Sequence, residues 1–160
     1  MENSVTAYSI LGVTPKPGYN TVMFIIGDYT LFDQQIRWLF LKDEKFVLYV
    51  QTSDNPERQY SPLVLAQTAK AMGLNPKVYF LGQGLRVLLP GAAEKIKLGA
   101  FPSVAEMLQK TMQMGIEIDV CEASKQMLGW DKVTLIPGVK IVGAATLNDL
   151  ALSANATMWF

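Results

Sequence analysis

The chain has 160 residues, of which half are apolar and 18% are charged, and its acidic and basic residues balance to a net charge of zero. Length and composition predict a single globular domain with a sizeable core, and the lack of a Lys/Arg cluster argues against a surface that neutralises nucleic-acid phosphates. The chain contains no histidine, which excludes a Ser-His-Asp triad, a Cys-His pair and a His-ligated zinc or haem within it.

The first residues show no cationic stretch followed by an apolar one, and apolar runs such as 22–26 are far too short to span a bilayer. The single cysteine cannot form an internal disulfide, so no oxidising compartment is implied. We therefore expect a soluble cytoplasmic protein with neither membrane nor nucleic-acid partners. The eight methionines lack the clustered spacing of copper sites, and we expect no metal and no cofactor.

Residues 1–44 differ in pattern from the rest of the chain. Residues 5–13 and 21–26 are plausible strands joined by a Pro- and Gly-containing turn, and apolar residues then recur at helical spacing between 31 and 40. The sequence between this segment and the rest of the chain does not have the composition of a linker. We expect a β-hairpin/helix extension of a single domain over 1–160, packed on the core or on a neighbouring subunit.

From residue 45 onward, strands and helices alternate. A continuous apolar run at 46–50 is typical of a parallel strand buried on both faces. A polar loop at 52–58 follows, and then a helix capped by Ser61, with Pro62 at its first position, that ends at Gly73. The second strand is predicted at 78–81.

The middle of the chain is less regular between 83 and 99. Ser103 and Glu106 then form a capping-box pattern that opens a helix ending at Gly115. A third strand is predicted over 116–120.

The last third of the chain continues the alternation. We predict a short helix at 122–128, a strand at 139–142, a helix beginning near Thr146 and a final strand at 156–160. Five strands separated mostly by helices predict a three-layer α/β/α sandwich with a mainly parallel five-stranded sheet. Local patterns do not specify the strand order.

Cys121 lies where the predicted third strand gives way to a helix. A thiol at a helix start meets backbone N–H groups and the positive end of the helix dipole, both of which favour the thiolate. Strand ends are also where open α/β sheets bind ligands. The position indicates sulfur chemistry, although free cysteine is also commonly buried as a small hydrophobe.

Three cations follow strand ends in the predicted fold. Arg58 lies in the loop after the first strand, Arg86 lies just beyond the second, and Lys125 is one turn into the helix that Cys121 opens. Because carboxyl ends of parallel strands share one edge of the sheet, these cations could converge on a thiolate, a persulfide anion or a bound oxyanion. The alternative for each is a solvated surface charge.

Two further patterns admit two interpretations each. Gly82 and Gly84 follow a strand and could form a substrate-binding loop, but the dinucleotide pattern fails at Val87, and a tight turn also explains them. Glu117 and Asp119 share one face of a strand. They could do acid–base work, or they could be the exposed side of an edge strand.

The segment from about residue 45 to 160 resembles the DsrE/DsrF-like sulfur-relay family. Three stretches carry the resemblance: the opening strand with its polar loop and the Ala-rich helix over 64–73, the stretch 115–129 around Cys121, and the close from 143 to 160. Among the residues of these stretches, only Cys121 has a reactive side chain, and the others are characteristic of the fold.

The resemblance implies a three-layer α/β fold and homo-oligomers, often trimers or hexamers. It also implies a cysteine that receives sulfur as a persulfide or thiosulfonate and passes it to a small partner such as a TusA-like carrier, and it places that cysteine at Cys121. Some relatives have a second cysteine, which this chain lacks, and the extension over 1–44 is not part of the family core.

We therefore interpret the chain as an oligomeric, sulfurtransferase-like sulfur carrier in which Cys121 is the nucleophile and Lys125 or an arginine supplies a counter-charge. One alternative is a non-catalytic binding or assembly module with an inert cysteine. Another is a cysteine-based redox sensor or peroxidase, but the usual peroxidatic motif, with Pro and Thr or Ser upstream of the cysteine, is missing before Cys121.

Overall fold

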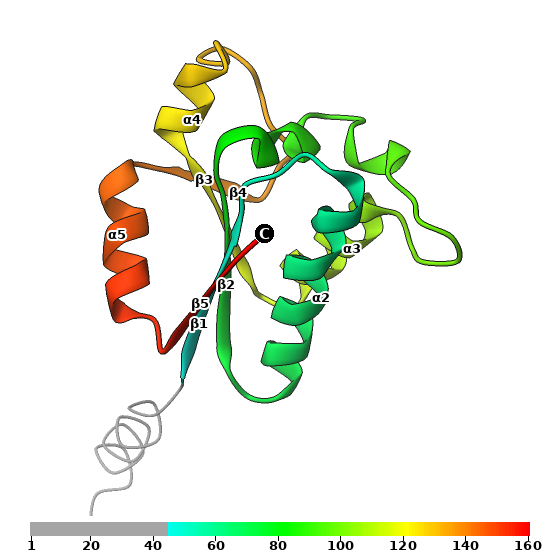
Figure 1. The fold of residues 1–160 in the computed structure, drawn as a ribbon. Helices are drawn as coiled ribbons and strands as arrows, with labels where there is room; N and C mark the ends of the chain where they lie inside the picture. Colours follow the sequence, from blue (N-terminus) through cyan, green and yellow to red (C-terminus); the bar gives the residue numbers. More distant parts are fainter. Residues whose placement is uncertain (1–44) are drawn as a thin grey trace, which may run out of the picture. The chain divides into compact units, whose positions relative to one another are not determined.

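The computed structural model describes residues 45–160, which form one five-stranded sheet flanked by helices (Figure 1). The strands are β1 (Phe46–Gln51), β2 (Asn75–Phe80), β3 (Glu117–Cys121), β4 (Val139–Val142) and β5 (Ala156–Trp159). Their order across the sheet is β4-β3-β2-β1-β5, and every neighbouring pair is parallel. The predicted five-stranded sheet is confirmed, and in the described residues its pairing is wholly parallel.

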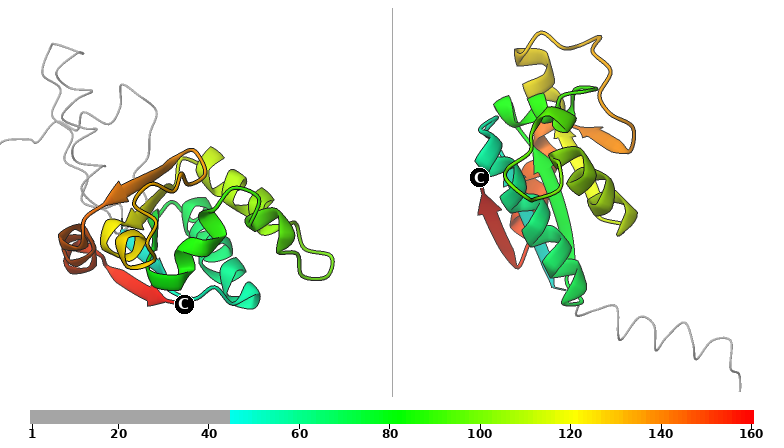
Figure 2. Two further views of the ribbon diagram at one scale, coloured as in Figure 1. Left: turned by 90° about the horizontal axis from the view of Figure 1, so that it is seen from above. Right: turned by 90° about the vertical axis from the view of Figure 1, so that its right-hand side faces the viewer.

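Helices cover both faces of this sheet. The α-helices are α2 (Pro56–Ala71), α3 (Val104–Gln113), α4 (Glu122–Met127) and α5 (Ala144–Ser153), and the short 3-10 helices are η2 (Gly82–Leu88) and η3 (Ala93–Lys95). Helices α2 and α3 lie on one side and α5 lies on the other, as the view from above shows (Figure 2). This arrangement is the predicted three-layer α/β/α sandwich.

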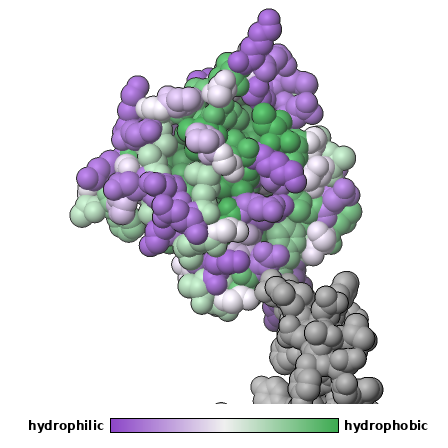
Figure 3. All heavy atoms as spheres, turned by 180° about the vertical axis from the view of Figure 1, so that it is seen from behind, coloured by the Kyte–Doolittle hydropathy of each residue, from purple (hydrophilic) through white to green (hydrophobic). Residues whose placement is uncertain are grey.

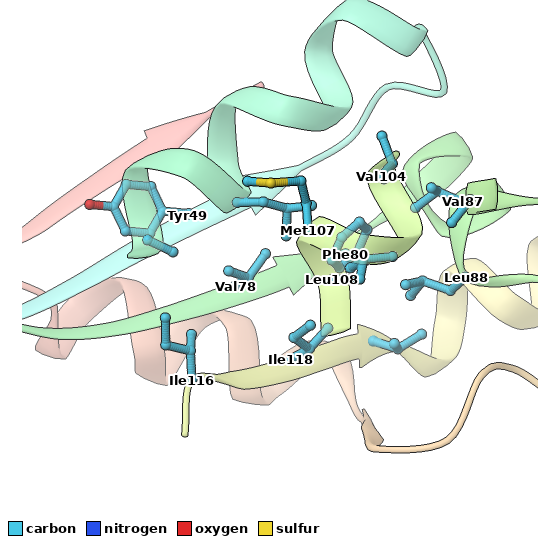
Figure 4. Packing of buried hydrophobic residues seen from close by; sticks show 14 of the residues in the cluster. Tyr49, Val78, Phe80, Val87, Leu88, Val104, Met107, Leu108, Ile116 and Ile118 are labelled. Atoms are coloured by element: carbon cyan, nitrogen blue, oxygen red, sulfur yellow. The ribbon is translucent and has the colours of Figure 1, made fainter. Parts of the chain in front are cut away.

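Alternate residues of each strand point to opposite faces, and they build two hydrophobic clusters. The larger cluster lies under α2 and α3, where Val78, Phe80 and Ile118 pack with Met107 and Leu108 (Figure 4). The smaller cluster lies on the other face and consists of four buried residues, Leu48, Val50, Tyr79 and Cys121, against the inner side of α5. Cys121 is therefore on the α5 face of the sheet.

Helix α2 begins earlier than the sequence predicted. Its N-cap is Asn55, whose side chain accepts a hydrogen bond from the Glu57 amide at 2.9 Å, and Pro56 takes the first position. Pro62 lies inside the helix, where it cannot donate the usual bond to the Arg58 carbonyl. The predicted start at Ser61 and Pro62 was wrong, because Asn55 and Pro56 offer the same signal earlier.

The remaining boundaries differ by smaller amounts. Helix α3 has both hydrogen bonds of the predicted capping box, which join Ser103 and Glu106. Strand β2 begins at Asn75 rather than at residue 78, so it includes Pro76, which can pair only through its carbonyl. Helix α5 begins at Ala144, with Gly143 as its N-cap, rather than near Thr146.

The predicted extension over 1–44, with its hairpin and helix, lies outside the described residues, and its packing stays a prediction. Within residues 45–160 no helix is both long enough and apolar enough to cross a membrane.

Candidate functional site

Cys121 is the last residue of β3 and also the N-cap of α4. Its side chain is 3% exposed and contacts the apolar cluster on the α5 face. The parallel strands place it at the carboxyl edge of the sheet, as the sequence predicted. The thiol thus lies at the edge of the sheet where α/β proteins bind ligands, and it is almost completely shielded from water.

The surroundings of the thiol favour its anionic form. Burial, the largest influence, raises the pKa of Cys121, but the Ser124 hydroxyl and amide, the Tyr79 hydroxyl and the Ala123 amide together bring it below its ordinary value of 9.0. These donors surround the sulfur without forming a side-chain capping bond of standard geometry at α4. They are neutral groups, so the thiolate is stabilised here by dipoles and not by a cation.

Ser124 is a site residue that the sequence reasoning missed. It is 3% exposed, and its hydroxyl oxygen accepts a hydrogen bond from the Gly82 amide at 2.9 Å. Ser124 therefore joins the start of η2 to the first turn of α4. The available signal was its place three residues after the N-cap cysteine, where a backbone N–H points back at the cap side chain.

Gly82 and Gly84 have different structural reasons to be glycine. Gly82 has φ of +58°, in the left-handed region that favours glycine. A Cβ on Gly84 would lie 2.5 Å from the Gln51 carbonyl oxygen of β1, and the Gly84 amide donates to the Thr52 carbonyl at 3.0 Å. Gly84 thus lets η2 approach β1 closely, and Gly82 supplies the backbone conformation; the role of both glycines in substrate binding stays a prediction.

Lys125 is buried, and its ammonium group is hydrogen-bonded to a backbone carbonyl. Its side chain is 8% exposed, and Nζ donates a hydrogen bond to the Asp131 carbonyl at 2.8 Å, in the loop after α4. The groups that lower the pKa of Cys121 do not include Lys125. The predicted counter-charge role of Lys125 stays a prediction, while its observed contact ties α4 to the following loop.

The two arginines lie at the same edge of the sheet as the thiol. Arg86, in η2, hydrogen-bonds Gln83, its Nε lies 3.6 Å from an Asp54 carboxylate oxygen, and its guanidinium lies 5.9 Å from the ring centre of Trp130. Arg58 is exposed in the first turn of α2, and not in the predicted loop. Neither arginine is among the groups that lower the pKa of Cys121, and their substrate contacts stay predictions.

A cluster of charged side chains lies on the same sheet face as Cys121. Lys77 Nζ lies 2.6 Å from a Glu117 carboxylate oxygen and 3.3 Å from Oδ2 of Asp119. Asp119 is 1% exposed, and β3 is an interior strand. The interpretation of these carboxylates as the exposed side of an edge strand was therefore wrong for the strand and for Asp119, whereas the Glu117 side chain is 63% exposed.

Known structures share this fold. The crystal structure of the YchN protein from Escherichia coli matches with a TM-score of 0.56 and 18% identity over 73% of this chain and 99% of that one. A conserved protein of unknown function from Bacteroides thetaiotaomicron, BT1422, matches with a TM-score of 0.57 and 13% identity over 72% of this chain and 95% of that one. At these identities the likeness shows the fold alone.

Two curated proteins from Methanocaldococcus jannaschii are similar in sequence, and both are described as uncharacterized. MJ0760 is 30% identical over 118 residues, which are 73% of this chain and 43% of that protein. MJ0989 is 28% identical over 104 residues, which are 65% of this chain and 85% of that protein. The chain thus spans less than half the length of MJ0760.

The model of the DsrE/DsrF-like family matches residues 44–160. This range contains the sheet, the helices that cover it and Cys121 with its surroundings. The chain therefore belongs to the DsrE/DsrF-like family, which is generally linked to sulfur relay.

Proposed function

We propose that the protein carries sulfane sulfur on Cys121 and passes it to an acceptor thiol. The observation that carries this proposal is the position of the one cysteine at the end of β3, where neutral donors lower its pKa. Membership of a family linked to sulfur relay supports the proposal. A thiolate is the form of cysteine that attacks sulfur, so a lowered pKa increases the reactive fraction near neutral pH.

The chemistry needs no oxidant or reductant beyond the donor and acceptor. The Cys121 thiolate attacks the outer sulfur of a persulfide R–S–SH, the S–S bond of the donor breaks, and R–S⁻ leaves with the bonding electron pair. With thiosulfate, sulfite leaves instead. The Cys121 persulfide then gives up its outer sulfur when an acceptor thiolate attacks it, and Cys121 leaves as a thiolate.

The residues around the sulfur have separate parts in these steps. The Ala123 and Ser124 amides stabilise the Cys121 thiolate, which is both the attacking and the leaving group. Ser124 is held by its bond to Gly82, which fixes the hydroxyl against the sulfur. Arg86 and Arg58, at the same edge, are the groups we propose for an anionic donor such as thiosulfate.

A second candidate function rests on the burial of the thiol. Cys121 is 3% exposed, and a fully packed cysteine is a common structural residue. The protein would then be an oligomeric binding or assembly module with an inert cysteine. A cysteine-based redox sensor or peroxidase is the remaining alternative.

Mass spectrometry of the intact protein separates these functions. We expect incubation with polysulfide to add the mass of sulfur atoms, and incubation with tetrathionate to add a thiosulfate group with release of thiosulfate; dithiothreitol should reverse both. Peroxide should add oxygen only slowly. An unmodified protein in all three reagents would favour the inert module, and rapid peroxide turnover with a thiol reductant would favour the peroxidase.

We also propose that the protein is a homo-oligomer, a trimer or hexamer, and that its acceptor is a small carrier of the TusA type. Exposed apolar side chains support an oligomer: Met127 and Leu152 are each 86% exposed, and Ile141 on β4 is 49% exposed. Helix α5 buries no residue completely. Hydrophobic surface also gathers in the middle of the face seen from behind (Figure 3), as is typical of interfaces.

Light scattering across a dilution series tests the assembly. We expect a mass of three or six times 17.7 kDa, and we expect Ile141→Lys, which adds a charge at the β4 edge, to lower it. Met72→Lys is the matched control, because Met72 is 70% exposed at the end of α2. A monomeric mass at every concentration would contradict the oligomer.

A further inference from the structure

The hydroxyl of Tyr79 is buried without a hydrogen bond. Tyr79 is 0% exposed, and its hydroxyl oxygen has no hydrogen-bond partner among the described residues. Leaving a buried polar group unpaired is costly, so most such groups in native proteins are paired, and each exception needs an explanation, of which a catalytic role is one. We therefore expect the Tyr79 hydroxyl to gain a hydrogen-bond partner while the protein functions.

The packing places Cys121 beside this hydroxyl. Tyr79 lies opposite Asp119 in the register between β2 and β3, and Cys121 follows two residues later on the same face of β3. Tyr79 and Cys121 belong to one buried cluster, with Leu48 and Val50 of β1. The tyrosine hydroxyl lies near enough to the sulfur to lower the pKa of the thiol.

The same surroundings keep Tyr79 protonated. Burial, and then the Cys121 thiol and the Asp119 carboxylate, raise the pKa of the Tyr79 hydroxyl. Asp119 is itself 1% exposed, with Oδ1 unpaired and Oδ2 at 3.3 Å from Lys77, which it shares with Glu117. One lysine between two carboxylates leaves a net negative charge, which opposes the loss of the phenolic proton.

Apart from Ser124 and the Ala123 amide, which also stabilise the thiolate, the described side chains around the sulfur offer no donor besides Tyr79. Lys140 of β4 lies opposite Asp119 in register and is exposed, and Glu122 at the start of α4 is also exposed. Helix α5 presents Leu147, Leu150 and Ala151 to the cluster, and these side chains have no polar atom to offer.

We propose that Tyr79 is a catalytic residue that donates a hydrogen bond to the anionic sulfur on Cys121. Its partner is the thiolate sulfur before loading and the terminal sulfur of the persulfide afterwards. The inference rests on the proposed sulfur-carrier function and names the side chain that would stabilise the bound sulfur. Because a hydroxyl has one proton, Tyr79 can serve one anion at a time, which suits a site that alternates between two sulfur anions.

Tyr79→Phe removes the hydroxyl and keeps the ring, and NMR can follow the result. Selective ¹³C labelling of cysteine Cβ gives one signal, since the chain has one cysteine, and its pH titration reports the thiol pKa without requiring reagent access. We expect a midpoint below 9.0 in the wild type and an increase of about one pKa unit or more in Tyr79→Phe. We also expect the titration midpoint of the loaded Cys121 persulfide to rise by a similar amount in Tyr79→Phe, because its terminal sulfur loses the same donor.

Tyr49→Phe is the matched control. Tyr49 is a 3% exposed tyrosine of the neighbouring strand, but it packs in the cluster under α2 and α3, so neither the thiol midpoint nor the persulfide midpoint should change. At a pH below the titration midpoint, where the thiol is protonated, the thermal midpoint of Tyr79→Phe should not fall, because the hydroxyl has no other partner to lose among the described residues. A fall at that pH would indicate a structural hydroxyl and would overturn the proposal.

The titration keeps the two proposals distinguishable. An unchanged midpoint in Tyr79→Phe overturns the role of Tyr79 even if the wild type carries sulfur. A wild type that never gains sulfur contradicts the carrier function, and with it the role of Tyr79 in holding sulfane sulfur. A shifted midpoint in Tyr79→Phe would in that case still demonstrate the hydrogen bond between Tyr79 and the resting thiolate.

Discussion

Replacing Cys121 with serine is expected to abolish every sulfane-sulfur adduct, because the chain has no other cysteine and a serine hydroxyl is not ionised near neutral pH. Intact mass after incubation with polysulfide or tetrathionate measures this result. We expect the wild type to gain mass reversibly and Cys121→Ser to keep its calculated mass. The change is all-or-none, so it is the largest functional effect that we predict.

Two further variants make the result specific to sulfur chemistry. Cys121→Ala should behave as Cys121→Ser does, and it avoids a new hydroxyl in a site that is 3% exposed. Ser124→Ala should slow loading without abolishing it, since it removes one hydrogen-bonding group of the thiolate and the acceptor of the Gly82 amide. A persistent adduct on folded Cys121→Ser would contradict Cys121 as the carrier.

Local patterns predicted most of the secondary structure. The capping box at Ser103 and Glu106 fixes the start of α3, and the apolar run of β1 is long enough to identify a buried strand. The start of α2 was missed because two cap-and-proline pairs compete within eight residues, 55–56 and 61–62. The burial of Gln59 and Tyr60 in the folded protein accompanies the earlier start, and that packing is not a local signal.

The site was predicted only as far as chain position determines it. Cys121 could be found because a strand end followed by a helix start is visible in sequence. Tyr79 could not be found, because in the sequence it is one apolar residue of a strand among others. Only the register of β2 and β3 places it beside Asp119. Strand order also decides whether Asp119 is buried, and that order depends on contacts between distant segments. The contact of Lys125 with Asp131 likewise depends on the path of the loop after α4.

Gly84→Ala is expected to give the largest loss of stability among single-methyl changes at the edge of the site. The new Cβ would lie 2.5 Å from the Gln51 carbonyl oxygen and 3.0 Å from its carbon. This obstacle is backbone, and β1 pairs with β2 on one side and β5 on the other, so it cannot move freely. Overpacking of this kind costs about 1–3 kcal/mol, which chemical denaturation measures as a lower midpoint.

The control variants separate this clash from other effects of adding a methyl group. Gly143→Ala meets no atom within 4 Å and has no positive φ, so its stability should change little. Gly82→Ala meets only the Thr52 carbonyl oxygen at 3.7 Å, and its cost of about 1–2 kcal/mol should come from its left-handed backbone. If Gly84→Ala instead lost sulfur loading at unchanged stability, Gly84 would contact the donor as the sequence predicted. The close approach to Gln51 favours the opposite outcome, in which stability falls and the folded fraction still loads sulfur.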